Sequence, residues 1–237
     1  MKDQTGLALR VAGLAFLMGA AATAAESAPA LSYPNRAPIA QYLMANRADE
    51  VALARSAAPA SISNDAEILV LGTHGYETAV KGKNGFVCLV ERSWDAGFND
   101  PIFWNPKIRG ADCLNPIAAQ SVLPHFMERA NWALAGASKA EMVERTKAEL
   151  AAGTYRLPAP GAMAFMMSKR QYLSDTGAHW RPHLMFFVAN IKDASWGANL
   201  PNSPVMTAQS GIDPITTFFV PIGHWSDGTP DEMQTRK

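Results

Sequence analysis

The feature that most constrains the fold of this chain is its pair of cysteines, Cys88 and Cys113. The N-terminal sequence indicates export to an oxidising compartment, where two cysteines can form a disulfide. Residues 1–10 carry two basic side chains, an apolar run covers residues 11–22, and small residues fill positions 22–24. This order is typical of a secretory signal peptide, so we expect cleavage after residue 24. The mature protein is then periplasmic or extracellular.

A retained membrane anchor is the alternative interpretation of the leader. The apolar run is only about half of the roughly 20 residues that a spanning helix needs, and Gly13 and Gly19 interrupt it. We therefore expect no stable membrane insertion. The chain has 21 Lys and Arg against 21 Asp and Glu. Cleavage removes two cations and one anion, and a nearly neutral chain offers no electrostatic basis for nucleic-acid binding.

Cys88 and Cys113 are predicted to form one disulfide, since they are the only two cysteines of an exported chain. Closing the loop between them removes about 3.5 kcal/mol of unfolded-state entropy in the chain model. The alternative is a nucleophilic Cys88 served by a histidine base.

The sequence predicts a single α+β domain over residues 38–237, after a flexible, Ala/Pro/Ser-rich leader at 25–37. Three to four helices are expected, at residues 38–56, 116–134 with a break at Pro124, and 139–152. Strands are expected at 67–71, 76–80, 86–92, 162–167, 183–189 and 216–222. These segregated elements predict a mainly antiparallel sheet of about six strands.

The Asn84-Gly85 pair lies between two of these strands and predicts a hairpin joining 76–80 to 86–92, because Asn-Gly suits a tight primed turn. Residues 93–115 follow as a long irregular segment that contains Trp94 and Trp104. A segment of this length is either functional or held by the disulfide.

Glu91 and His74 are candidate acid–base groups, with His224 as a third. Glu91 is flanked by apolar residues, so its pKa is expected to be raised, which suits a general acid or base. The alternative is a glutamate that pairs with an arginine on the solvent face. The sequence contains no GxSxG, HExxH, P-loop or dinucleotide motif, so the common hydrolase and nucleotide-binding templates gain no support.

Three histidines, His179, His183 and His224, form a candidate transition-metal site, with His74 as a further ligand. Pro182 lies between the first two and opposes the helix that their spacing would need, so only a turn would bring them together. The alternative is that these histidines only hydrogen-bond to their loops.

Loop tryptophans are a candidate ligand-binding set, because five of the six lie beside turn-forming or polar residues. Aromatic faces of this kind bind sugar rings and other flat ligands. Alternatively, the tryptophans build small cores beneath the loops. The set consists of Trp94, Trp104, Trp180, Trp196 and Trp225, with Arg181 beside Trp180.

The strings GTHGYETAVKGKNGFVCLVERSW (72–94), HWRPHLMFF, WGANLP and GHWSDGT (179–229) resemble an uncharacterised group of secreted bacterial proteins. The resemblance implies an exported, single-domain chain and carries no activity, cofactor or site residue.

Two functions therefore remain as hypotheses. The first is a binding module that recognises a small-molecule or glycan-like ligand through loop aromatics. The second is a metal-dependent or acid–base hydrolase that uses the loop histidines and Glu91.

Overall fold

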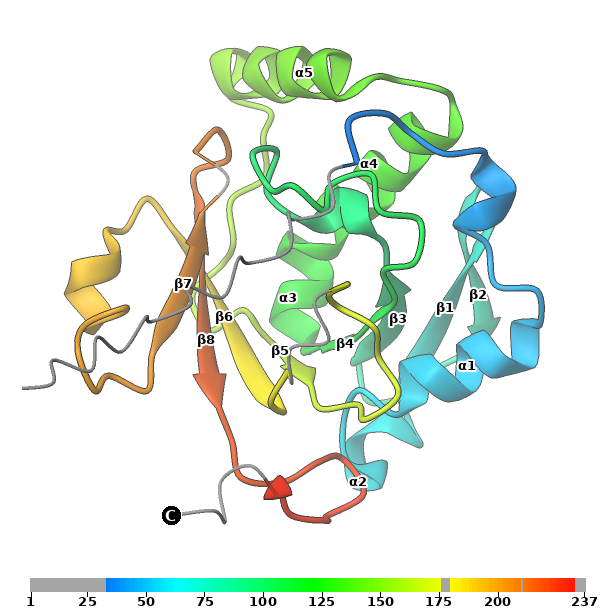
Figure 1. Ribbon diagram of the computed structural model, residues 1–237, viewed down its shortest axis with the longest axis vertical. Coiled ribbons are helices and arrows are strands. Elements are labelled where there is room, and N and C mark those ends of the chain that lie inside the picture. The colour runs from blue at the N-terminus through cyan, green and yellow to red at the C-terminus, as the bar shows by residue number, and fades with distance from the viewer. Residues whose placement is uncertain (1–32, 176–179, 210, 233–237) are drawn as a thin grey trace, which may run out of the picture. The chain divides into compact units, whose positions relative to one another are not determined.

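The computed structural model describes residues 33–175, 180–209 and 211–232, and these form an α+β domain built on one sheet (Figure 1). Within the described residues the sheet has eight strands, in the order β2-β1-β3-β4-β5-β6-β8-β7. Every neighbouring pair is antiparallel except β1 and β3. The strands are β1 (Glu67–Gly72), β2 (Gly75–Val80), β3 (Val87–Glu91), β4 (Gly110–Leu114), β5 (Met163–Met166), β6 (His183–Ala189), β7 (Met206–Gln209) and β8 (Ile215–Pro221).

The expected number of six strands is wrong, because β4 and β7 lie in segments whose short, mixed patterns gave no strand signal. Five α-helices occur in the described residues, against the three to four expected. They are α1 (Arg47–Arg55), α2 (Ala60–Ser63), α3 (Pro116–Ser121), α4 (Leu123–Leu134) and α5 (Lys139–Ala152). No helix in this part of the chain has the length and apolar content to cross a membrane. The predicted signal peptide, residues 1–24, lies outside the described residues.

The helix predicted over residues 38–56 begins much later than expected. Only a short 3₁₀ turn follows Pro38, and α1 begins after Asn46, whose side chain accepts a hydrogen bond from the Ala48 amide at 2.8 Å. Asn is a strong N-cap and satisfies a first-turn amide. In addition, the Tyr42 carbonyl accepts a hydrogen bond from Arg92 Nε at 2.7 Å, so it is used by a tertiary contact instead of a helix.

The predicted hairpin between β2 and β3 is also wrong. β1 pairs with β2 through the turn at residues 73–74, and β3 pairs with the other edge of β1 in parallel. The Asn84-Gly85 turn lies in a short crossover that passes the start of β1. The Asn84 side chain donates to the Ile62 carbonyl and accepts from the Phe86 amide, which directs the chain away from β2. The pair therefore forms a turn, but this turn joins no hairpin.

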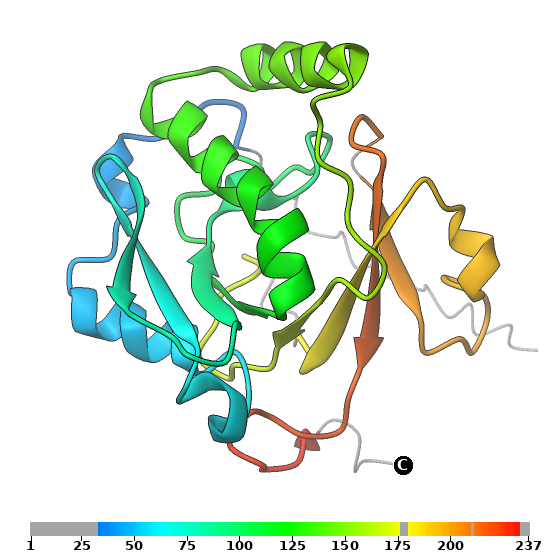
Figure 2. The same cartoon turned by 180° about the vertical axis from the view of Figure 1, so that it is seen from behind.

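Helices cover both faces of the sheet (Figures 1 and 2), and each face buries its own core. α1 packs on one face, against β1, β3 and β4, and this core includes the Cys88–Cys113 disulfide. α3 and α4 lie on the other face, where Leu89 and Leu114 join a larger aromatic core. Side chains alternate along a strand. The predicted disulfide is thus confirmed, and it joins residues that are directly opposite in the β3–β4 register.

The irregular segment after β3 forms its own aromatic core. Trp94, Phe98, Phe103 and Trp104 are each at most 2% exposed and belong to the larger core. The segment begins with the 3₁₀ helix η2 (Ser93–Asp95), which contacts α4. These aromatic side chains hold the long connection against the sheet.

An ion pair buried within the fold anchors the end of β3. Arg92 and Glu50 are 1% and 2% exposed, and Arg92 Nη2 lies 2.8 Å from Glu50 Oε1. The same Glu50 oxygen accepts from the Leu71 amide at 3.1 Å, while Arg92 also donates to the carbonyls of Tyr42 and Val90. The pair therefore connects α1, β1 and β3.

The disulfide should contribute about 3.5 kcal/mol to the free energy of unfolding, since it closes a 25-residue separation in the unfolded chain. We expect the Cys88→Ala/Cys113→Ala double variant to lose that amount in urea unfolding. Reductant should lower the stability of the wild type and leave the variant unchanged. Equal stability of the reduced and oxidised wild type would contradict the prediction.

Gly82 should be essential for the crossover between β2 and β3. A Cβ at this position would lie 2.2 Å from the Glu67 amide nitrogen, and backbone cannot give way as a flexible side chain can. We expect Gly82→Ala to lower the free energy of unfolding by at least about 3 kcal/mol. The control is Gly72→Ala, whose Cβ would meet its nearest neighbour at 3.5 Å. Similar denaturation midpoints for the two variants would refute this.

Candidate functional site

A cavity of about 470 Å³ lies on the α4 side of the sheet. Its volume is within the range of small-molecule pockets, about 300–1,000 Å³. The sheet contributes an apolar floor, and α4 with the segment after β3 contributes most of the remaining wall. The floor residues are Met166, Met185, Phe187, Met206, Ile215 and Phe219. A ligand in this cavity would bury its apolar part against the sheet.

Carboxyl groups gather at the end of the cavity where β3 ends. Glu91 is the last residue of β3, and Asp95 closes η2 by accepting a hydrogen bond from the Arg92 amide at 3.0 Å. Asp112 is opposite Leu89 in the β3–β4 register, so it lies on the same face of the sheet as Glu91. Glu91 and Asp95 line the cavity, and Asp112 is fully buried beside them.

The pKa values of all three carboxyl groups are raised. Burial raises the pKa of Glu91 well above its usual range, and the neighbouring Asp112 raises it further. Burial also raises the pKa of Asp112, although hydrogen bonds from Glu91 and the Cys113 amide oppose the rise. Neither oxygen of Asp112 has a partner of regular geometry among the described residues, so these contacts are weak. The pKa of Asp95 is raised by burial and then by Glu91.

An ion pair forms another part of the wall. Arg129 of α4 lies 2.5 Å from Asp213, and both side chains are about 10% exposed. Arg129 also donates to the carbonyls of Trp94 and Ala96, and the Tyr155 hydroxyl donates to Asp213 at 3.2 Å. Burial raises the pKa of Tyr155, so this phenol remains a hydrogen-bond donor.

Two histidines line the cavity, and both have lowered pKa values because they are buried. The His125 ring stacks on Tyr155 with a centroid distance of 4.3 Å, and its Nε2 lies 2.5 Å from the Arg156 carbonyl. His183 Nδ1 lies 2.8 Å from the Arg181 carbonyl, which can only accept, so Nδ1 carries the proton. His183 Nε2 is then a free acceptor, since it has no partner in the described part of the chain.

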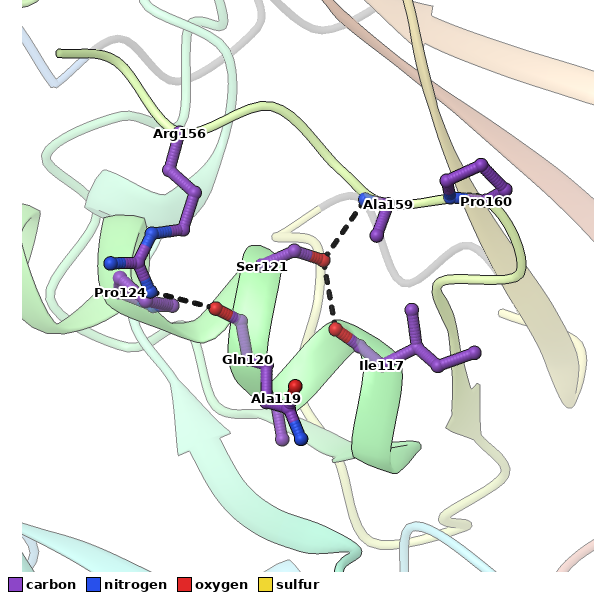
Figure 3. Close-up of a pocket in the computed structure, with 8 residues that line it drawn as sticks. All are labelled: Ile117, Ala119, Gln120, Ser121, Pro124, Arg156, Ala159 and Pro160. Atoms are coloured by element: carbon purple, nitrogen blue, oxygen red, sulfur yellow. Dashed lines mark hydrogen bonds between the residues drawn. The ribbon is translucent and has the colours of Figure 1, made fainter.

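Figure 3 shows a second hollow, which lies between α3, the start of α4 and residues 156–160. It measures about 730 Å³ but is open to solvent. Ser121 Oγ donates to the Ile117 carbonyl and accepts from the Ala159 amide, and Arg156 donates to the Gln120 carbonyl. These groups are already bonded to one another, so the hollow offers a ligand fewer polar contacts than the cavity does.

The structure separates the tryptophans of the predicted ligand-binding set. Trp94, Trp104 and Trp225 are at most 8% exposed, and the first two belong to the aromatic core. Trp196 is 40% exposed but stacks on Phe218 with centroids 4.3 Å apart. Trp180 is 41% exposed and lines the cavity. The neighbouring Arg181 is exposed, and among the predicted aromatics only Trp180 lines the described cavity wall.

The predicted catalytic and metal-binding residues that the structure describes lie at several different points of the fold. Glu91 and His183 line the cavity, whereas His74 lies in the β1–β2 turn and His224 follows β8. His179 lies outside the described residues. Within the described ranges, no group of three or more His, Cys, Asp or Glu side chains is arranged to hold a metal ion.

Several residues in or beside the cavity were not predicted from the sequence. Asp95 follows Trp94, a predicted ligand-binding residue, and Asp112 precedes Cys113 of the predicted disulfide. Arg129 directly follows Glu128 in α4, so the sequence does not mark it as a buried cation with a distant partner. That partner, Asp213, lies 84 residues away, so no local pattern identifies it.

Comparison with known proteins gives no match to a family model, a curated protein or a solved structure.

The carboxyl groups should make stability depend on pH. Their raised pKa values mean that, above about pH 4, the folded state holds more protons than the unfolded state. The free energy of unfolding should therefore fall as the pH rises from 4 toward the raised pKa values. We expect Glu91→Gln to remove part of this fall. The free energy of unfolding of the variant minus that of the wild type should be about 1–2 kcal/mol higher at pH 7.5 than at pH 4.

Urea unfolding at pH 4, 5.5 and 7.5 measures this difference. Asp49→Asn, on the exposed side of α1, is the matched control and should keep the wild-type slope. A Glu91→Gln variant whose stability follows the wild type across the whole range would contradict the assignment.

Proposed function

We propose that the protein is a binding module for a small molecule with a flat, apolar body. The observation that carries this proposal is the cavity itself, whose apolar floor faces a small number of convergent polar groups. Ligand sites in proteins commonly combine these two properties. Trp180 lines the same cavity and supplies an exposed aromatic face for the ligand.

The polar wall supports binding because its groups are held in place before a ligand arrives. Arg129 is fixed by Asp213 and two backbone carbonyls, and His125 is fixed by the Arg156 carbonyl. A wall of this kind loses little side-chain entropy when a ligand binds. A glycan suits the cavity less well, because its hydroxyl groups would face the methionine and phenylalanine floor without partners.

The hydrolase remains the second candidate. Glu91 lines the cavity with a raised pKa, which suits an acid–base group, and His183 offers a free Nε2 in the same cavity. The cavity lining does not include His74 or His224, so this candidate loses two of its expected residues.

Titration with 2-(1-naphthyl)ethanol tests the binding function, since this probe has a flat apolar body and a neutral head. We expect saturable binding of one probe per chain. Calorimetry and naphthalene fluorescence measure this binding. Thr217 lies on β8 within the cavity lining, so Thr217→Phe should fill part of the cavity and weaken binding at least about tenfold.

The matched control is Thr154→Phe, an exposed position after α5 outside the cavity lining, which should bind like the wild type. The absence of saturable binding, or equal binding by the Thr217→Phe variant, would overturn the proposed function.

A further inference from the structure

We propose that the end of the cavity formed by Glu91, Ser93 and Asp95 binds the ammonium group of a primary amine, whose apolar body occupies the rest of the cavity. This inference rests on the proposed function and names the chemical class of the ligand.

The charges that line the cavity favour a cation. Arg92 forms a salt bridge with Glu50 and donates hydrogen bonds to the carbonyls of Tyr42 and Val90. Arg129 forms a salt bridge with Asp213 and donates hydrogen bonds to two further carbonyls. Among the described residues, Glu91 and Asp95 line the cavity and form no salt bridge, although Arg129 and Arg92 lie close enough to lower the pKa of Asp95.

Unpartnered atoms at the same place are the second, independent observation. Ser93 is 1% exposed and lines the cavity, and its Oγ has no hydrogen-bond partner within the described chain. Asp95 Oδ1 is likewise buried without a partner in that part of the structure. An unsatisfied buried polar atom costs about 1–3 kcal/mol, so a ligand that satisfies these atoms gains affinity.

These atoms are mainly hydrogen-bond acceptors, so they favour an ammonium group as the ligand. The carboxyl oxygens accept hydrogen bonds, the Ser93 hydroxyl can accept one, and His183 Nε2 is a further acceptor in the cavity wall. A primary ammonium group has three donors and no acceptor, so it matches a set of acceptors. A carboxylate or phosphate would instead place acceptor against acceptor beside Glu91.

The raised carboxyl pKa values agree with this assignment. Beyond the effect of burial, Asp112 raises the pKa of Glu91, Glu91 raises that of Asp95, and Asp95 raises that of Asp112. Arg129 and Arg92 lower the pKa of Asp95 only in part. A bound ammonium would add a cation beside these carboxyl groups and lower their pKa values. Amine binding near neutral pH should therefore release protons from the carboxyl groups to solvent.

Three probes that share the naphthyl body test the inference: 2-(1-naphthyl)ethylamine, 2-(1-naphthyl)ethanol and 1-naphthylacetate. At pH 7 we expect the amine to bind at least tenfold more tightly than the alcohol, and the carboxylate to bind most weakly. Calorimetry in buffers of different ionisation enthalpy should show proton release with the amine and none with the alcohol.

Glu91→Gln and Asp95→Asn should each weaken amine binding at least tenfold and weaken alcohol binding by a clearly smaller factor. Asp49→Asn is the matched control and should change neither. Thermal unfolding of each variant confirms that it is folded.

The outcomes separate the two proposals. Equal affinity for amine and alcohol, or equal loss of both in Glu91→Gln, would overturn the amine site and leave the binding function standing. Failure of all three probes to bind would overturn both.

Discussion

The ion pair between Arg92 and Glu50 determines where the chain goes after β3. A guanidinium removed from water needs a partner for its charge and acceptors for its N–H groups, and Glu50 with the Tyr42 and Val90 carbonyls supplies them. Because these groups come from α1, the preceding loop and β3, their geometry is satisfied only when these segments pack together. The carboxyl groups on either side of Arg92 then lie at the edge of the cavity.

The cavity follows from how the segment after β3 fills its space. Large aromatic side chains such as Trp94 and Phe98 turn inward and build a core beneath η2. Phe98 also packs under the Arg129 guanidinium, 4.3 Å from its ring centroid. The polar residues between the aromatics are left to face the cavity, so the same segment provides both a packed core and a polar wall.

The sequence predicts those elements whose signals are local. The helix 139–152 has its capping box at Ser138, and Gly153 ends it with φ of 67°, both as expected. The start of α1 and the partner of β3 were wrong because tertiary contacts decide them: Arg92 takes the Tyr42 carbonyl, and the crossover at Gly82 places β3 beside β1. The site was predicted only in part. Glu91 could be predicted from its apolar neighbours in the sequence, whereas Asp213 could not, because its partner Arg129 is distant in the sequence.

The disulfide lies on the face of the sheet opposite the cavity, yet it bears on the cavity's chemistry. Cys88 and Cys113 hold β3 and β4 in one alignment, and the alternating residues Glu91 and Asp112 consequently point to the other side together. A slip of β4 by a single position would turn Asp112 toward α1 and bring its neighbour into its place. Disulfide formation in an oxidising environment would thus determine whether Asp112 or a neighbouring residue of β4 lies beside Glu91.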